Sequence, residues 1–139
     1  MYIFKASGET FDSVVKNQRH AFANMPKDWY KGEVVLVSKN RKDCKPGEKQ
    51  IQYVMKLEDI RGTSEQEIEK YWPGNGNRWR YIVICSNRKY LKKPFNLENV
   101  LDEEKVRRYN HAVTFTKLDP LDEKLILQYI KDTNGIILS

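Results

Sequence analysis

Two tryptophans lie where they could hold a flat ring between them. Trp72 and Trp79 flank the loop 73–78, which is rich in glycine and asparagine. One indole is expected at a helix end and the other at a strand start, so both faces can turn toward one pocket. Stacking on an aromatic face contributes about 1–3 kcal/mol per nucleobase. The pair therefore predicts a base-binding site; the alternative interpretation is that both rings belong to the core or to a hinge.

The positive charge of the chain is concentrated beside the same tryptophans. The net charge is +6, yet residues 70–97 contain seven basic residues and no acidic one, so this window carries +7 and the rest of the chain −1. Basic residues interleaved with aromatic ones favour phosphate contacts combined with base stacking. The alternatives are a solvated face or a surface for an acidic protein partner. The predicted phosphate-binding residues are Arg78, Arg80, Arg88, Lys89, Lys92 and Lys93.

The residue types that enzymes use form no recognisable motif. The two histidines, His20 and His111, are far apart in sequence, and no nucleophile elbow, phosphate-binding glycine loop or paired-acid motif is present. Cys44 and Cys85 form no CxxC pair, which argues against a zinc site. We therefore expect a binding module without catalytic residues, metal or cofactor. The enzymatic alternative is a nuclease, which requires carboxylates clustered around a metal ion.

Local patterns predict the elements that must position these residues. Helical spacing predicts a helix from Thr10 to about Ala23. A capping box begins a short helix at Ser64, and the residue order Asp119-Pro120 begins another that ends before Gly135. Residues 39–49 are expected to be a charged loop and 91–101 irregular. Apolar runs bounded by turn residues predict strands at 2–4, 33–37, 51–58, 79–85 and 111–116.

The order of these elements predicts the fold class. Strands and helices are mixed without regular alternation, which favours an α+β fold with a mixed, curved sheet or open β-barrel packed by helices. A length of 139 residues fits a single domain. The chain opens without a signal pattern and contains no apolar run of membrane-spanning length, so we expect a soluble, cytoplasmic protein. The apolar tail 135–139 predicts either a last strand or the cut edge of a domain from a longer protein.

The order of motifs resembles that of YTH domains. Three features account for the resemblance. They are the opening strand with Lys5 before a helix, the two tryptophans that bracket a loop before a strand, and a late strand followed by Asp119-Pro120 and a closing helix. The related EVE and ASCH domains of the PUA-like superfamily share this plan. The resemblance covers nearly the whole chain as a pattern of order and spacing. It implies a PUA-like fold and a reader of modified bases.

The resemblance also implies which residues bind the base. YTH domains flip N6-methyladenine into an aromatic cage, and by position Trp72 and Trp79 match two of its walls. The third wall comes from the end of the first helix or just after it. The other residues that the resemblance places at the pocket are Phe22, Asn24, Trp29 and Tyr30 for that wall, and Lys5 and Ser7.

The sequence therefore predicts a nucleic-acid-binding module that extrudes a modified base. N6-methyladenine is favoured, with methylated cytosine as the other option. Similar domains stand at the N-terminus of some McrB-type modification-dependent restriction GTPases, so we expect methylated DNA as the target and a GTPase motor elsewhere in a longer protein. The alternatives are a reader of modified RNA and a basic protein-interaction domain without a base pocket.

Overall fold

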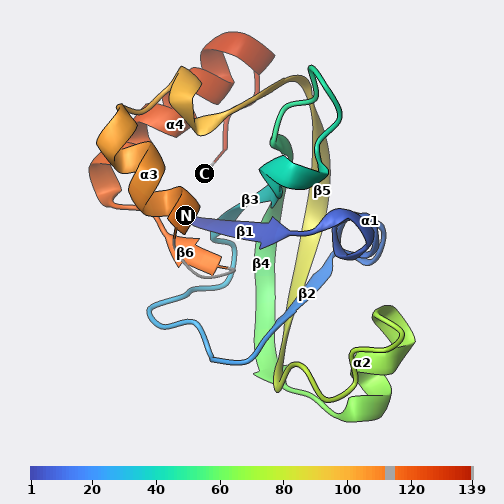
Figure 1. Cartoon of the computed structure of the whole chain (residues 1–139). Coiled ribbons are helices and arrows are strands. Elements are labelled where there is room, and N and C mark those ends of the chain that lie inside the picture. Colours follow the sequence, from blue (N-terminus) through green and yellow to red (C-terminus); the bar gives the residue numbers. More distant parts are fainter. Residues whose placement is uncertain (112–114, 139) are drawn as a thin grey trace.

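The computed structural model describes residues 1–111 and 115–138 (Figure 1). The strands are β1 (Tyr2–Ala6), β2 (Arg19–Phe22), β3 (Val34–Lys39), β4 (Ile51–Gly62), β5 (Tyr81–Phe95) and β6 (Phe115–Lys117). They form one sheet in the order β2-β5-β4-β3-β1-β6. β1 runs parallel to β3, and every other neighbouring pair is antiparallel. The sheet curls into a half-barrel, which confirms the predicted α+β class with a mixed, curved sheet.

Helices cover both faces of this sheet. They are α1 (Gly8–Asn17), α2 (Glu65–Tyr71), α3 (Glu103–His111) and α4 (Pro120–Asn134), with the 3-10 turns η1 (Arg41–Asp43) and η2 (Leu97–Asn99). In Figure 1, α3 and α4 lie together on one side of the sheet, while α1 lies on the other and α2 lies near the start of β5. No helix in the described part of the chain is long and apolar enough to cross a membrane.

Each face of the sheet packs on its own apolar core. Side chains alternate along a strand, so Phe4 enters the core under α1 and α2 while Ile3 enters the core under α3 and α4. Trp72 and Trp79 belong to the first of these cores. β1 is therefore buried on both faces, which explains why its sequence is almost continuously apolar.

The predicted helix 10–23 is wrong in its second half. α1 ends at Asn17, because Gln18 adopts a left-handed conformation with φ of 53°. Residues 19–22 form β2 and pair with β5, with Phe22 opposite Tyr81. Ala21 and Phe22 continue the helical spacing of the apolar residues, but pairing with β5 buries them and also satisfies their backbone groups.

The later elements also differ from the prediction. β5 begins at Tyr81 and continues to Phe95, so residues 91–95 are not irregular. β5 continues past residue 85, where the predicted strand ends, because it stays paired with β4 through three register shifts. His111 ends α3, a helix that the sequence did not predict, and residues 112–114 of the predicted strand lie outside the described residues. The described tail, 135–138, forms no strand.

Several local signals are confirmed. Ser64 Oγ accepts a hydrogen bond from the Glu67 backbone N–H at 3.2 Å, which is one half of the predicted capping box; the Glu67 carboxylate pairs with Arg61 instead. Asp119 precedes Pro120 at the start of α4. Gly135 ends α4 with φ of 68°, a conformation that glycine adopts without steric cost.

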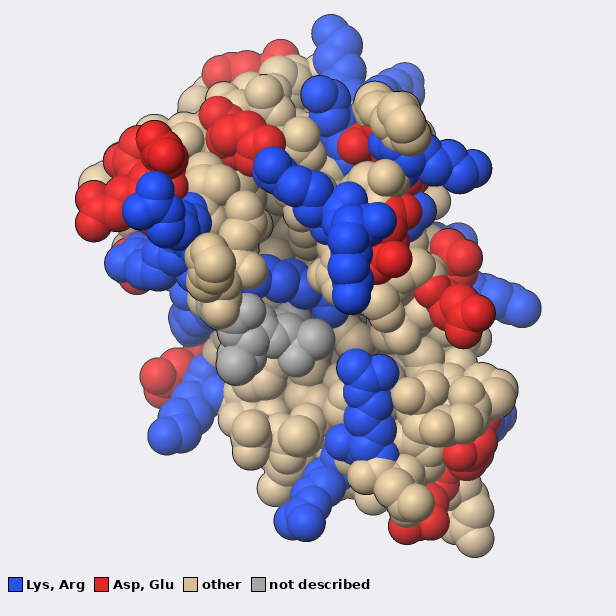
Figure 2. Space-filling model, viewed as in Figure 1, with Lys and Arg blue, Asp and Glu red and all other residues tan. Residues whose placement is uncertain are grey.

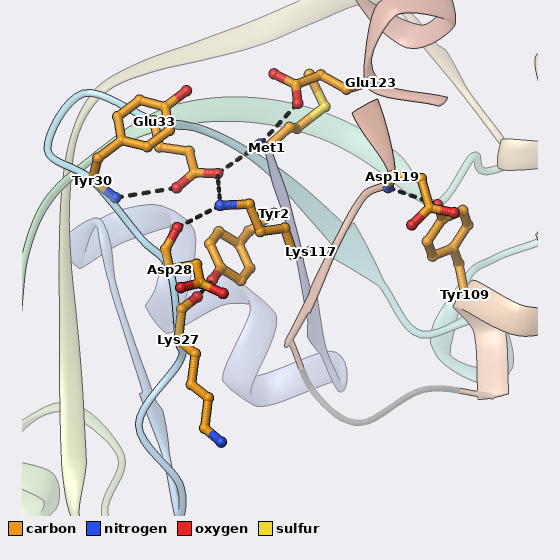
Figure 3. Close-up of polar contacts among 10 residues, drawn as sticks. All are labelled: Met1, Tyr2, Lys27, Asp28, Tyr30, Glu33, Tyr109, Lys117, Asp119 and Glu123. Atoms are coloured by element: carbon orange, nitrogen blue, oxygen red, sulfur yellow. Dashed lines mark hydrogen bonds and ion pairs between the residues drawn. The ribbon is translucent and has the colours of Figure 1, made fainter. Parts of the chain in front are cut away.

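A buried carboxylate ties β1, β3 and β6 together (Figure 3). Glu33 is buried, and its carboxylate lies 2.7 Å from the amine of Met1 and 3.4 Å from Lys117 Nζ. The backbone N–H of Tyr30 donates to the other carboxylate oxygen at 3.3 Å. Burying a charge is costly unless it is paired, and here both cations and the N–H converge on it. This cluster fixes the loop 23–33 beside the sheet.

A second buried carboxylate joins α3 to α4. The Tyr109 hydroxyl donates to Asp122 Oδ2 at 2.5 Å and accepts from the Asp119 N–H at 3.1 Å. Lys105 Nζ donates to the other oxygen of Asp122 at 2.6 Å. Although burial raises the pKa of Asp122, the hydrogen bonds from Lys105 and Tyr109 leave it below its ordinary value. The carboxylate of Asp122 thus holds α3 and α4 together, and it depends on the hydrogen bonds that Lys105 and Tyr109 donate to it.

We expect Tyr109→Phe to lower the free energy of unfolding by about 1–2 kcal/mol, because Asp122 then loses a donor inside the protein. Urea denaturation at neutral pH measures this change. Tyr129→Phe is the control, since Tyr129 packs against the same core and is expected to change stability little. Equal losses in the two variants would mean that the hydroxyl bond to Asp122 contributes nothing specific.

Candidate nucleic-acid interface

A basic cavity of about 350 Å³ opens where β1 and β3 end. The two strands are parallel, so their carboxyl ends meet at one edge, and Lys5 lies opposite Ser38 in register. Figure 2 shows a hollow in the middle of this face, with Lys and Arg side chains inside it and along its rim. The lining residues, called the basic cavity below, are Lys5, Ser38, Asn40, Arg41, Lys42, Gln50 and Asn110.

Lys5 is held at the wall of the basic cavity by α3. Its ammonium donates to the backbone carbonyl of Tyr109 in the last turn of α3, where the helix dipole favours a cation. Burial lowers the pKa of Lys5. Lys5 is the one predicted base-binding residue that lines this cavity.

The rim of the basic cavity carries two further cations from η1. Arg41 donates to Gln50 Oε1 at 3.1 Å and forms an exposed ion pair with Glu98 at 2.7 Å. Lys42 is exposed. Among the residues that the structure describes, no carboxylate lines this cavity. Arg and Lys side chains arranged in this way suit the oxygens of phosphate groups, and an exposed ion pair such as Arg41–Glu98 contributes too little to prevent exchange of partners.

The two predicted cage tryptophans lie in the core rather than around an open slot. Trp72 is 3% exposed and Trp79 is 8% exposed. Their ring centroids are 5.4 Å apart and the planes are inclined by 78°, an edge-to-face contact with no space for a base between them. Arg78 lies over Trp79, with its guanidinium carbon 4.5 Å from the ring centroid. In this conformation both rings act as core residues.

His20 completes this aromatic cluster. Its ring lies 6.3 Å from Trp72 and 6.2 Å from Trp79, centroid to centroid. Nδ1 accepts from the Ala21 N–H at 2.9 Å, so the proton is on Nε2, which donates to the carbonyl of Lys5 at 3.0 Å. Burial lowers the pKa of His20 to about 4. The imidazole is therefore neutral at physiological pH and links β2 to β1.

The remaining predicted base-binding residues are distributed over separate places. Phe22 is buried with its ring 4.5 Å from that of Phe115. Trp29 is partly buried against the same core, and Tyr30 and Asn24 are exposed in the loop 23–33. Ser7 occupies the N-cap position of α1 without a side-chain capping bond. The structure thus separates these residues from the basic cavity, while their role in binding stays a prediction.

All six predicted phosphate-binding residues are exposed, but none lines the basic cavity. They follow the length of β5 and the loop before it, with Arg78 and Arg80 near α2 and Lys93 near the end of α4. Sequence reasoning missed Arg41 and Lys42. The available signal was a basic run directly after a buried strand, but its meaning depends on the parallel pairing of β1 with β3.

The described residues contain no group of three His, Cys, Asp or Glu side chains that could hold a metal ion. The chemistry available at the basic cavity is therefore that of its cations and neutral polar groups, which bind anions.

Comparison with known proteins places the fold. By sequence, the chain matches no protein-family model and no curated protein. Its structure is similar to ASCH from Zymomonas mobilis, with 14% identity, coverage of 91% of this chain and 93% of that chain, and a TM-score of 0.59. A single-substitution variant of that protein gives a TM-score of 0.66 at 10% identity, covering 92% of this chain and 94% of that chain. The predicted PUA-like fold is confirmed; the narrower YTH-like or EVE-like relation stays a prediction.

Proposed function

We propose that this domain binds nucleic acid, with backbone phosphates at the basic cavity. The observation that carries the proposal is the convergence of Lys5, Arg41 and Lys42 on one hollow, which no carboxylate of the described residues lines. Phosphate contacts from Lys and Arg supply most of the affinity in non-specific nucleic-acid binding. The PUA-like fold supports the same function, because the YTH and EVE domains that the sequence resembles read nucleic acids.

The finer parts of the proposal concern the base and the biological setting. We propose a modified base as the preferred target, and we favour N6-methyladenine over methylated cytosine. We also favour methylated DNA over RNA as the nucleic acid that carries it. The resemblance to YTH domains supports this choice. Trp72 and Trp79 are the proposed walls, but their rings must separate before a base can enter. A role beside a restriction GTPase, and binding without catalysis, are parts of the same proposal.

A fluorescence-anisotropy titration tests the basic cavity. Lys42→Ala is expected to weaken binding to a labelled oligonucleotide and to reduce the slope of log K against log salt by about 0.7, the value for one phosphate contact on a single strand. Methylated and unmethylated strands of DNA and RNA are titrated in parallel to test the finer proposal, and the oligonucleotide is expected to be recovered intact.

Lys124→Ala is the matched control, because Lys124 is also exposed but lies on α4 and does not line the cavity. The proposal fails if the Lys42 and Lys124 variants have the same affinity and salt slope as the unmodified domain. Equal binding of methylated and unmethylated strands would remove only the modified-base part.

A further inference from the structure

We infer that a second cavity, between α1 and the strands β4 and β5, is a stacking site for an unpaired nucleobase. This inference rests on the proposed nucleic-acid binding and adds a site for the base. The cavity measures about 560 Å³ and is called the aromatic shelf below. Its lining residues are Phe11, Asp12, Val15, Lys16, Tyr53, Arg88 and Tyr90.

The aromatic shelf presents a ring that folding leaves uncovered. Tyr90 is 57% exposed although it stands in the middle of a long strand. It lies directly opposite Tyr53 on β4, and the two ring centroids are 5.2 Å apart with an interplanar angle of 62°. Phe11 is buried and packs against Tyr53, with 6.2 Å between the two ring centroids. Two paired strands thus hold an exposed aromatic face rigidly, which lowers the entropy cost of binding.

Cations flank these rings. Arg88 Nη1 donates to the carbonyl of Val15 at 2.6 Å, which fixes the guanidinium at the edge of the shelf. Lys16 is exposed in the last turn of α1, and Lys39 Nζ lies 5.6 Å from the ring centroid of Phe11. Of the residues that the structure describes, Asp12 is the one carboxylate that lines the cavity. Exposed aromatic faces between basic side chains are how proteins bind single strands, because bases stack while the backbone meets the cations.

The aromatic shelf and the basic cavity share the end of β3. Ser38 and Asn40 line the basic cavity, whereas the side chain of Lys39, between them in sequence, reaches Phe11 on the other side. In Figure 1, η1 and α1 lie next to one another at this end of the sheet. A single strand that passes round this end of β3 can therefore contact Arg41 and Lys42 with its phosphates and, further along its length, place a base on Tyr90.

Substitutions at Tyr90 test the stacking, with an abasic strand as the diagnostic ligand. Tyr90→Ala and Tyr90→Leu are expected to weaken binding of a thymidine homopolymer about tenfold or more, since each loses the aromatic face. Tyr90→Phe is expected to bind like the unmodified domain. On an abasic strand of the same length, which keeps the phosphates and lacks the bases, all four proteins are expected to bind equally.

The outcomes separate this inference from the proposed function. Lys42→Ala weakens binding to both strands, whereas the Tyr90 variants weaken only the strand with bases. If the Tyr90 variants bind the homopolymer normally while Lys42→Ala does not, the shelf is wrong and the proposed function stands. If no oligonucleotide binds, both are wrong. Equal losses on the abasic strand, or tighter Tyr90-dependent binding of an acidic peptide, also overturn the shelf. Leu125→Ala, at another exposed apolar residue, is the matched control for surface truncation.

Discussion

Trp72→Ala is expected to lower the free energy of unfolding by about 3–5 kcal/mol, the range for removing a fully buried aromatic side chain. Trp72 directly follows α2, packs edge-to-face on Trp79 and contacts His20. Truncation leaves a cavity among rigid rings that cannot collapse easily. Urea denaturation followed by circular dichroism measures the change.

Trp72→Phe and a binding titration decide between a core and a cage role. The indole N–H of Trp72 is buried and has no hydrogen-bond partner in the described part of the chain, so phenylalanine removes an unsatisfied polar group and is expected to cost much less than alanine. A core residue gives large losses of stability in the alanine variant. A stability loss below about 1 kcal/mol, together with a lost preference for methylated strands, would instead indicate that the ring serves mainly as a cage wall.

Acidification from pH 6.5 to pH 4 is expected to remove about 3 kcal/mol of stability through His20 alone. Burial lowers the pKa of this histidine from 6.5 to about 4 in the folded protein. Between these values the unfolded chain binds a proton that the folded protein does not, so stability falls as the pH falls. Each pH unit in this window contributes about 1.4 kcal/mol.

The measurement compares His20→Gln with the unmodified domain in urea at several pH values, because carboxylates titrate in the same range and must be subtracted. The glutamine variant is expected to lose less stability between pH 6.5 and pH 4, although it is less stable at neutral pH. His111→Gln, at an exposed histidine, serves as the control and should follow the unmodified protein. Parallel curves for His20→Gln and the unmodified domain would contradict the assignment.

Features encoded by a few adjacent residues could be predicted from the sequence. The cap at Ser64 depends on side chains within one helical turn, and α4 begins at Pro120, whose ring suits the first helical position. β2 could not be predicted, because Ala21 and Phe22 fit a helical face as well as a strand, and only the partner strand β5 decides.

The candidate sites were harder to predict than the fold, since they depend on contacts between distant segments. Lys5 and Arg41 meet only because β1 and β3 are parallel neighbours. Tyr90 has a readable signal, an aromatic residue among basic ones, but the predicted strand ends at residue 85, so no strand partner such as Tyr53 could be assigned to it. The burial of Trp72 could not be predicted from its type, which suggests recognition as readily as packing; its ring lies in the core in this structure, and its role in binding stays a prediction.

The long strand β5 also has an edge on which a second chain could pair. β2 covers only residues 81–84 of β5, so the remainder of the strand has one side on which another chain could add a strand. Two side chains occupy hydrogen-bonding groups on that side: Gln18 accepts from the Arg88 N–H at 3.0 Å, and Asn134 accepts from the Lys93 N–H at 2.8 Å.

Charge and backbone geometry reinforce this protection. Lys89, Lys92 and Lys93 place like charges along the open edge, and Pro94 lacks an N–H to donate. Two identical edges would therefore repel one another and find several of their hydrogen-bonding groups already occupied. The acid-free stretch 70–97 thus opposes edge-to-edge pairing of two such sheets, and the same positive charges attract polyanions.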